Sequence, residues 1–153
     1  MKLSCTQENL AHALSVVAPI AARGGTLPIL SNVLLEAHEG TLKLSATNLE
    51  IGVTAHVRGK IEQEGTFTVA GRLFNDYVGL LESSAVSLAL SGEHLEIHSG
   101  NARTRIHGLP AEEFPVIPAL DGQTTATLAV SDFFEALTQV LFSVSASDAR
   151  PEL

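Results

Sequence analysis

The sequence predicts an α+β domain made of two strand-helix-strands repeats, with the helices on one face of antiparallel sheets. Two observations predict this class: a five-position pattern of apolar residues returns along the chain, and alternating apolar and polar residues fill the stretches between its copies. Composition agrees, because 153 residues that are 45% hydrophobic and 17% charged suffice for one well-packed domain of ordinary size.

The recurring pattern changes from the spacing of a strand to the spacing of a helix. Two apolar residues lie two positions apart, as on one face of a strand, and three more follow at the spacing of one helix face. The copies are Leu3, Cys5, Leu10, Leu14 and Val17; Phe67, Val69, Phe74, Val78 and Leu81; and Ala126, Leu128, Phe133, Leu137 and Val140. Three copies predict three strand-to-helix units.

Alternating stretches after the first two helices predict strand meanders. After the first helix we expect strands over residues 29–37, 41–46 and 51–61, with a turn at Glu39-Gly40. After the second we expect strands over 86–90, 95–97 and 104–109, with turns at Ser91-Gly92 and Ser99-Gly100-Asn101. Two complete units predict a domain over residues 1–120, which the proline-rich segment 110–118 ends as a linker.

The third unit predicts the start of a second domain, residues 121–153. It has a predicted strand over 125–130 and an amphipathic helix from Ser131 to about Val144, with Ser131 or Asp132 suited to cap it. No sheet that could cover the apolar face of this helix follows, so we expect an N-terminal fragment of a longer protein. The alternative, a helix that folds back on the first domain, stays open.

The single cysteine and the absence of long apolar stretches limit the cellular setting. Cys5 has no partner for a disulfide within the chain, and a metal site built on thiolates is excluded. No secretion signal is present, and no stretch approaches the roughly 20 apolar residues that span a bilayer. We therefore expect a cytoplasmic protein without a membrane partner.

No group of residues predicts catalysis or a cofactor. A nucleophile paired with a base is missing, as are a Gly-x-Ser-x-Gly motif and a glycine loop that could cradle a phosphate. His94, Glu96 and His98 share one face of a predicted strand, but a zinc site needs a fourth ligand and the sequence offers none nearby. A polar strand face exposed to solvent is the favoured interpretation, and we expect no metal.

Three segments resemble a known family. They are Thr26-Leu27-Pro28-Ile29-Leu30-Ser31-Asn32, Thr47-Asn48-Leu49-Glu50 and Leu109-Pro110-Ala111-Glu112-Glu113-Phe114-Pro115. With them the chain resembles, over its whole length, the β subunit of bacterial DNA polymerase III, the sliding clamp. The resemblance implies the DNA-clamp fold, in which three such domains form a subunit and two subunits close head to tail into a ring around duplex DNA.

The function that this resemblance implies is a non-catalytic processivity factor. The ring would tether the replicative polymerase to its template, a clamp loader would place it there, and the full-length protein would be a homodimer. The net charge of -8 argues against binding DNA by affinity, since phosphate neutralisation usually supplies that affinity, but a closed ring can hold DNA topologically. A free-standing protein-interaction module that never encircles DNA is the alternative, and an enzyme is a distant third.

The resemblance also implies residues that contact DNA. Arg23 and Gly24 lie in the loop after the first helix, Arg72 lies at the start of the second, and Ser147 and Arg150 lie in the loop after the third. Arg150 is the most plausible phosphate contact in that last loop. An ordinary solvated arginine is the competing interpretation of Arg23.

A subunit interface is implied at the strand expected to end the first domain's sheet. Arg103, Arg105 and Ile106 lie on that strand, and by resemblance its edge meets the third domain of the other subunit. The arginines are equally well interpreted as charges that discourage unwanted pairing at an edge, and both interpretations can hold at once.

Overall fold

The computed structural model describes residues 1–21, 27–82, 84–118 and 126–144. The chain divides into two compact units, Met1–Ile117 and Pro118–Leu153. The division falls inside the proline-rich segment, slightly before the boundary expected at residue 120. No helix among the described residues is long and apolar enough to cross a membrane.

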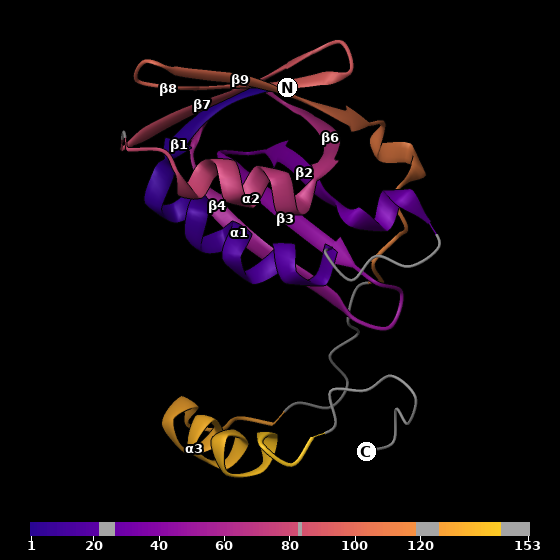
Figure 1. Cartoon of the computed structure of the whole chain (residues 1–153), viewed down its shortest axis with the longest axis vertical. Helices are drawn as coiled ribbons and strands as arrows, with labels where there is room; N and C mark the ends of the chain where they lie inside the picture. The colour runs from indigo at the N-terminus through magenta and orange to yellow at the C-terminus, as the bar shows by residue number, and fades with distance from the viewer. Residues whose placement is uncertain (22–26, 83, 119–125, 145–153) are drawn as a thin grey trace. The chain divides into compact units, whose positions relative to one another are not determined.

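In its described part, the first unit is a nine-stranded antiparallel sheet that curves around two helices (Figure 1). Its strands are β1 (Lys2–Thr6), β2 (Asn32–His38), β3 (Thr41–Thr47), β4 (Gly52–Arg58), β5 (Lys60–Gln63), β6 (Gly65–Ala70), β7 (Ala85–Ser91), β8 (His94–Ser99) and β9 (Ala102–Leu109). They lie in the order β4-β3-β2-β6-β9-β8-β7-β1-β5. The predicted α+β class, with helices on one face of antiparallel strands, is confirmed.

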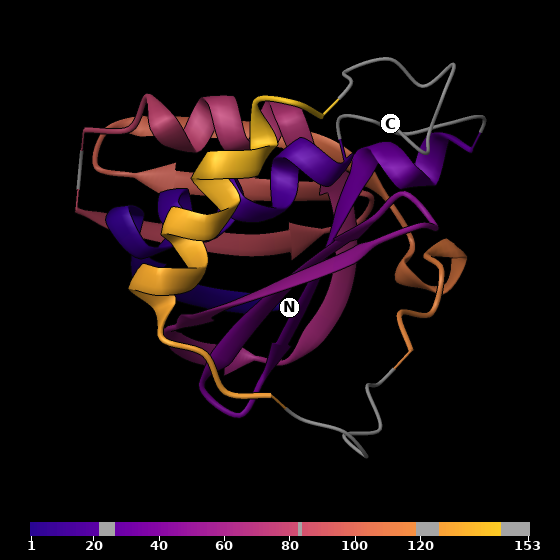
Figure 2. The same ribbon diagram turned by 90° about the horizontal axis from the view of Figure 1, so that it is seen from below.

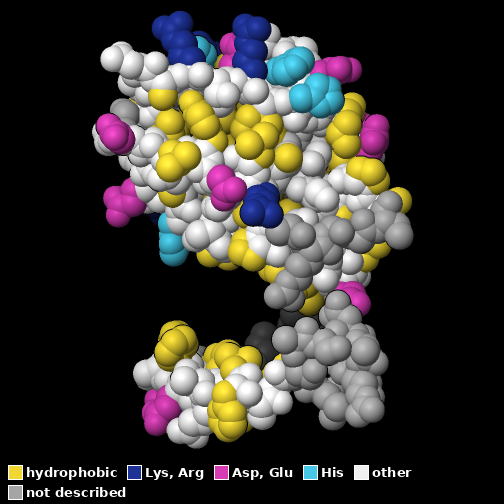
Figure 3. Space-filling view, in the orientation of Figure 1, with side chains coloured by type: hydrophobic (Ala, Val, Ile, Leu, Met, Phe, Trp, Pro, Cys, Tyr) yellow, Lys and Arg dark blue, Asp and Glu magenta, His cyan; other side chains and the backbone are white. Residues whose placement is uncertain are grey.

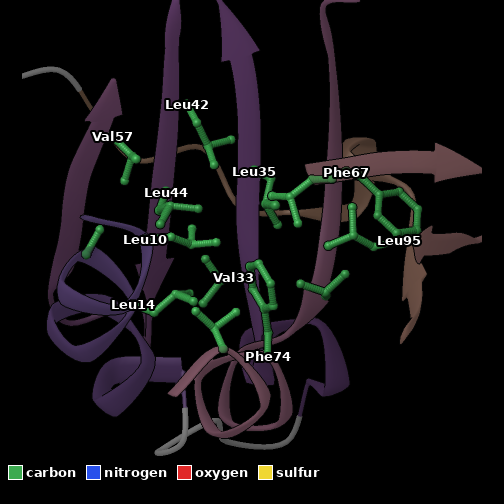
Figure 4. Packing of buried hydrophobic residues seen from close by; sticks show 14 of the residues in the cluster. Leu10, Leu14, Val33, Leu35, Leu42, Leu44, Val57, Phe67, Phe74 and Leu95 are labelled. Atoms are coloured by element: carbon green, nitrogen blue, oxygen red, sulfur yellow. The ribbon is translucent and has the colours of Figure 1, made fainter. Parts of the chain in front are cut away.

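Helices α1 (Gln7–Ala21) and α2 (Gly71–Gly79) bury all but one of the helical positions that the repeated pattern marked in the first two copies; Leu81 lies beyond the end of α2 and is only partly buried. Leu10, Leu14 and Val17 of α1 are fully buried, as are Phe74 and Val78 of α2. In the core they meet side chains of the neighbouring strands, among them Val33, Leu35, Leu42 and Leu44 (Figure 4). Removal of this apolar surface from water is the main force that holds the helices to the sheet.

The two helices lie side by side, as both ribbon views show (Figures 1 and 2). The hydroxyl of Thr6 accepts a hydrogen bond from the backbone N–H of Asn9, 3.4 Å away, which is the pattern of a helix N-cap. The Gln7 side-chain amide donates to the carbonyl of Val78 at 2.9 Å, a carbonyl near the end of α2 that also accepts from the backbone N–H of Leu81 at 3.3 Å. The start of α1 is thereby fixed to the end of α2.

Two of the three family-like segments pack against each other. Ile29 and Leu30 from the first segment and Phe114 from the third are between 3% and 8% exposed and form a small second core. Leu34, Leu109 and Ile117 pack around them. This cluster holds the segment between α1 and β2 to the last segment of the unit.

A buried polar chain joins the same region. The side-chain amide of Asn32 donates to the hydroxyl of Thr68 at 3.0 Å, and that hydroxyl donates to the carbonyl of Leu109 at 2.8 Å. Asn32 is 7% exposed and Thr68 is fully buried, so these polar groups need partners inside the protein. The chain of hydrogen bonds connects β2, β6 and β9.

The remaining segment, residues 47–50, forms the turn between β3 and β4. The Asn48 carboxamide oxygen accepts hydrogen bonds from the backbone N–H groups of Glu50, at 3.1 Å, and Ile51, at 2.9 Å. The Thr47 hydroxyl accepts another from Leu49, whose φ of 75° lies in the left-handed region. Local side-chain bonds hold a backbone conformation that leucine rarely adopts. All three segments therefore have structural roles.

Two predicted strands differ from the structure. The strand expected over 29–37 begins only at Asn32, because Pro28–Ser31 form a 3-10 turn with proline at its first position. The strand expected over 51–61 is split into β4 and β5 at Gly59, whose N–H bonds to the carbonyl of Gly40 at 3.1 Å. A Cβ at Gly59 would lie 2.7 Å from the carbonyl oxygen of Ser4, so the chain passes β1 where only glycine fits.

The second unit contains helix α3, Val130–Leu141. Of the strand expected over 125–130, residues 126–129 are described and form no strand, which corrects that prediction: an isolated extended segment has no neighbour to bond with. The helix is confirmed, but it begins at Val130 with Ala129 as its N-cap, so Ser131 and Asp132 lie in its first turn and do not cap it. None of its residues is buried. Phe133 is 52% exposed and Leu141 is 58% exposed, so within this unit the apolar face that the sequence predicted stays uncovered.

Candidate nucleic-acid interface and subunit edge

The exposed face of α1 and α2 carries Arg72, the predicted DNA contact that falls within the described residues. On α1 this face carries Glu8, Asn9, His12, Ser15, Val16 and Pro19, and on α2 it carries Arg72, Leu73 and Asp76. A shallow groove of about 310 Å³ runs between the helices and is lined by Ser15, Ala18, Pro19, Arg72 and Asn75. Apart from Arg72, the side chains that line the groove are small or neutral.

Arg72 is the one lysine or arginine on the described part of this helix face. Its side chain is 85% exposed, and its Nε lies 3.8 Å from the carboxylate of Asp76 one turn further along α2. An exposed pair at this distance contributes little and exchanges freely with water or another anion. Arg72 can therefore turn to a phosphate without breaking a strong contact.

Four of the predicted DNA contacts lie outside the described residues. These are Arg23, Gly24, Ser147 and Arg150. Of the predicted contacts, Arg72 alone falls within the described residues. The groove residues Ser15 and Asn75 were missed by sequence reasoning, because small polar side chains on a helix carry no signal of their own.

Strand β9 lies in the middle of the sheet order, yet most of it forms an open edge. It pairs with β6 only through Gly108 and Leu109, whereas residues 102–107 pair only with β8 among the described strands. The N–H of Gly108 donates to the carbonyl of Glu93 at 3.0 Å. Because bonded and non-bonded pairs alternate along an antiparallel ladder, Arg103, Arg105 and His107 direct their backbone groups away from β8.

The predicted interface residues divide between two environments. Arg103 and Arg105 are exposed on the outward face of β9, whereas Ile106 is 4% exposed and packs in the core. Arg105 donates to the carboxylate of Glu96 on β8 at 2.8 Å. The open edge thus presents two arginine side chains, while Ile106 holds the strand to the domain from inside.

Strands β8 and β9 form a ribbon whose outward positions are all charged or titratable. We call this surface the outward ribbon face; its residues are His94, Glu96, His98, Arg103, Arg105 and His107. In the space-filling view, Lys, Arg and His side chains gather over these strands (Figure 3). The imidazoles of His94 and His107 meet edge to face, with ring centroids 5.3 Å apart.

A second open edge lies at β4, which ends the sheet order on one side, as β5 does on the other. The bond from Gly59 N–H to the carbonyl of Gly40 sets the alternation of the β3–β4 ladder. By that alternation Gly52, Thr54, His56 and Arg58 direct their backbone groups away from β3. Sequence reasoning missed this edge, because strand order does not follow from the pattern of a single strand.

Within the described residues, no three His, Cys, Asp or Glu side chains are arranged to hold a metal ion. Glu96, which the sequence placed with His94 and His98, bonds to Arg105 and lies 3.9 Å from His98. Cys5 is 9% exposed, and burial raises the pKa of its thiol to about 11. The thiol therefore stays protonated at neutral pH and is a poor nucleophile.

Two adjacent helices on one side of a curved antiparallel sheet, with strand edges left open, define a clamp-type domain. The family described as "DNA polymerase III beta subunit, N-terminal domain" matches residues 1–118. The chain belongs to this family.

Named relatives agree with this assignment. The chain is 33% identical over 162 residues to the beta sliding clamp of Synechocystis sp. and 32% identical over 153 residues to that of Streptomyces coelicolor. These alignments cover 100% of this chain and 41% and 40% of the two relatives, so the chain spans about two fifths of their length.

Solved structures show the same fold. The DNA polymerase sliding clamp of Caulobacter crescentus matches with a TM-score of 0.87 at 30% identity, over 98% of this chain and 41% of that one. The DNA polymerase III beta subunit of Thermotoga maritima matches with a TM-score of 0.88 at 32% identity, over 97% of this chain and 40% of that one.

Proposed function

We propose that this chain supplies the amino-terminal domain of a DNA sliding clamp, a non-catalytic ring that encircles duplex DNA and tethers the replicative polymerase. The proposal rests on the arrangement of this chain, which belongs to the family: its helices lie on one face of the sheet, and the strand edges at β4 and β9 are open. An open edge presents unpaired N–H and C=O groups that another strand can complete. A domain open on both sides can be continued in both directions, which a ring requires.

The helix face is the proposed inner wall of the ring. The small, neutral groove and the single arginine on this face suit a ring that binds DNA weakly, because strong phosphate contacts would slow sliding. Retention then follows from closure, and the effective concentration of the polymerase at its template rises without a high affinity for DNA. The net charge of -8 is compatible with this mechanism.

The open part of β9 is the proposed subunit edge. Arg103 and Arg105 support this role because they place positive charge beside unpaired backbone groups, which fits an acidic strand from the other subunit. The second unit is proposed to begin the next clamp domain, whose remaining strands would cover α3. Arg23, Gly24, Ser147 and Arg150 remain proposed DNA contacts, and a clamp loader and the bacterial cytoplasm are the proposed partner and setting.

Primer extension tests the tethering function. The full-length protein, its clamp loader and the replicative polymerase of the same organism are added to a long primed single-stranded template. With an excess of competitor template that prevents rebinding, we expect much longer products when the full-length protein is present. Products of unchanged length, with a loader shown to hydrolyse ATP on this DNA, would contradict the proposal.

Reversal of charge at Arg72 tests the inner wall. The affinity for DNA falls as salt rises, and each lost phosphate contact makes the plot of log affinity against log salt less steep by about one unit of slope. Arg72→Glu in the full-length protein is therefore expected to make this dependence less steep by about that amount. Fluorescence anisotropy with a short duplex over a series of salt concentrations measures the slope. Lys60→Glu, on the exposed edge strand β5, is the matched control and should leave it unchanged. Equal slopes for both variants would place Arg72 away from DNA.

A further inference from the structure

The outward ribbon face concentrates histidine beside the proposed subunit edge. Three of the six histidines of the chain lie on it, and the remaining positions are Arg103, Arg105 and Glu96. His107 is also one of the residues whose backbone groups face the open edge. Histidine is the side chain whose charge changes between pH 5 and 8. The other three histidines, His12, His38 and His56, lie on three separate elements, so the ribbon is where protonation would add several charges side by side.

The strand register decides which charges meet on protonation. His94 lies directly opposite His107, and His98 lies directly opposite Arg103. Because Gly108 and Glu93 form a bonded pair, both of these pairs are non-bonded ones, in which the side chains come closest. Protonation would therefore put two cations opposite each other at both places, an arrangement that destabilises an antiparallel pair.

Nearby carboxylates offset only part of this repulsion. Glu93 lies 3.5 Å from His107, and Glu96 lies 3.9 Å from His98 but already holds Arg105 at 2.8 Å. On the far side of β8, the outward positions of β7 are Ser87, Ala89 and Ser91, which are not titratable. On β1 the nearest charge is Lys2, which pairs with Glu62 at 2.7 Å. Five cations would then face two carboxylates.

We propose that the β8–β9 ribbon is an acid-sensitive element that loosens the subunit edge when its histidines are protonated. The effect on the subunit edge rests on the proposed function. The response of the ribbon to acid does not, because it follows from the ribbon's own residues. The cross-strand repulsion opens the ribbon that supports residues 102–107, and a frayed edge offers a poorer template for a strand of the other subunit. Ring association would weaken as pH falls from about 7.5 to 5.5, the range over which imidazoles titrate.

Hydrogen exchange on the 153-residue chain tests the ribbon without any ring. Protection of the β8–β9 amides, corrected for intrinsic exchange, is expected to fall by roughly three- to tenfold between pH 7.5 and 5.5 at low salt. The β1–β7 ladder carries no histidine and serves as the internal reference. The fall should shrink in 1 M salt and vanish in a H94Q/H98Q/H107Q variant. A fall of the same size in both ladders, or in that variant, would overturn the inference.

Association of the full-length protein tests the link to the ring. Sedimentation at both pH values is expected to show weaker association at pH 5.5, with little change in the H94Q/H98Q/H107Q variant. Equal association of the wild type at both values, with ribbon protection still falling, would overturn the regulatory link. A full-length protein that does not associate at either pH would contradict the proposed ring and likewise remove the link, whereas the exchange result would stand on its own.

Discussion

Substitution of Gly108 by alanine is expected to destabilise the first unit by about 3 kcal/mol, a large fraction of the roughly 5 to 15 kcal/mol that typically holds a domain folded. Gly108 sits where β9 passes from β8 to β6. An added Cβ would overlap the carbonyl oxygen of Thr68 and lie 2.5 Å from the ring of Phe67. Neither neighbour can move cheaply, because Thr68 belongs to the buried polar chain and Phe67 to the core.

Urea unfolding followed by circular dichroism measures this loss of stability. Gly79→Ala is the matched control, since a Cβ there would meet nothing within 4 Å and the residue ends helix α2. Alanine is a better helix former than glycine, so this variant should be as stable as the wild type or slightly more stable. If Gly108→Ala unfolded at the same urea concentration as Gly79→Ala, the close crossing of β6 and β9 would be wrong.

Replacement of Phe74 by alanine is expected to cost about 3 to 5 kcal/mol. Phe74 is the largest fully buried side chain, and it points from α2 into the space beside Val33 and Leu35 (Figure 4). The strands around it bond to one another on both sides and cannot collapse into the cavity, so most of the lost contact stays lost. The effect tests how much Phe74 contributes to holding α2 on the sheet.

The neighbouring Leu73 supplies the control for that experiment. Leu73 is 56% exposed, and its truncation to alanine should change the free energy of unfolding by no more than about 0.5 kcal/mol. Thermal or urea unfolding of both variants gives the comparison. A Leu73→Ala variant that lost as much stability as Phe74→Ala would mean that α2 turns a different face to the core.

Local periodicity predicted the helices and most strands, because the side chains that each element buries recur at the spacing of that element. The positions Leu10, Leu14 and Val17 of α1, and Phe74 and Val78 of α2, are the ones that the spacing marked. Breaks in regular structure were not predictable in the same way. The 3-10 turn at Pro28–Ser31 and the split at Gly59 depend on contacts with distant parts of the chain, such as the approach of Gly59 to Ser4.

The candidate sites were predicted less completely, for a physical reason. An open edge is a property of strand order, and neither the partial pairing of β9 nor the free side of β4 follows from the residues of those strands. The family-like segments have structural roles instead. Asn32 forms a buried hydrogen bond, Phe114 packs in the small second core, and Asn48 stabilises a turn. Of the predicted DNA contacts, Arg72 alone falls in the described residues, and its role remains a proposal.

We propose that this domain belongs to a ring that holds DNA by closure. The most direct measurement is the retention of the full-length protein, loaded on circular duplex DNA, before and after a single restriction cut. We expect stable retention on the circle in high salt and rapid loss after the cut, because a closed ring slides off a free end. Equal retention on circular and linear DNA would contradict the ring, and no retention on either would favour a protein-interaction module that does not encircle DNA.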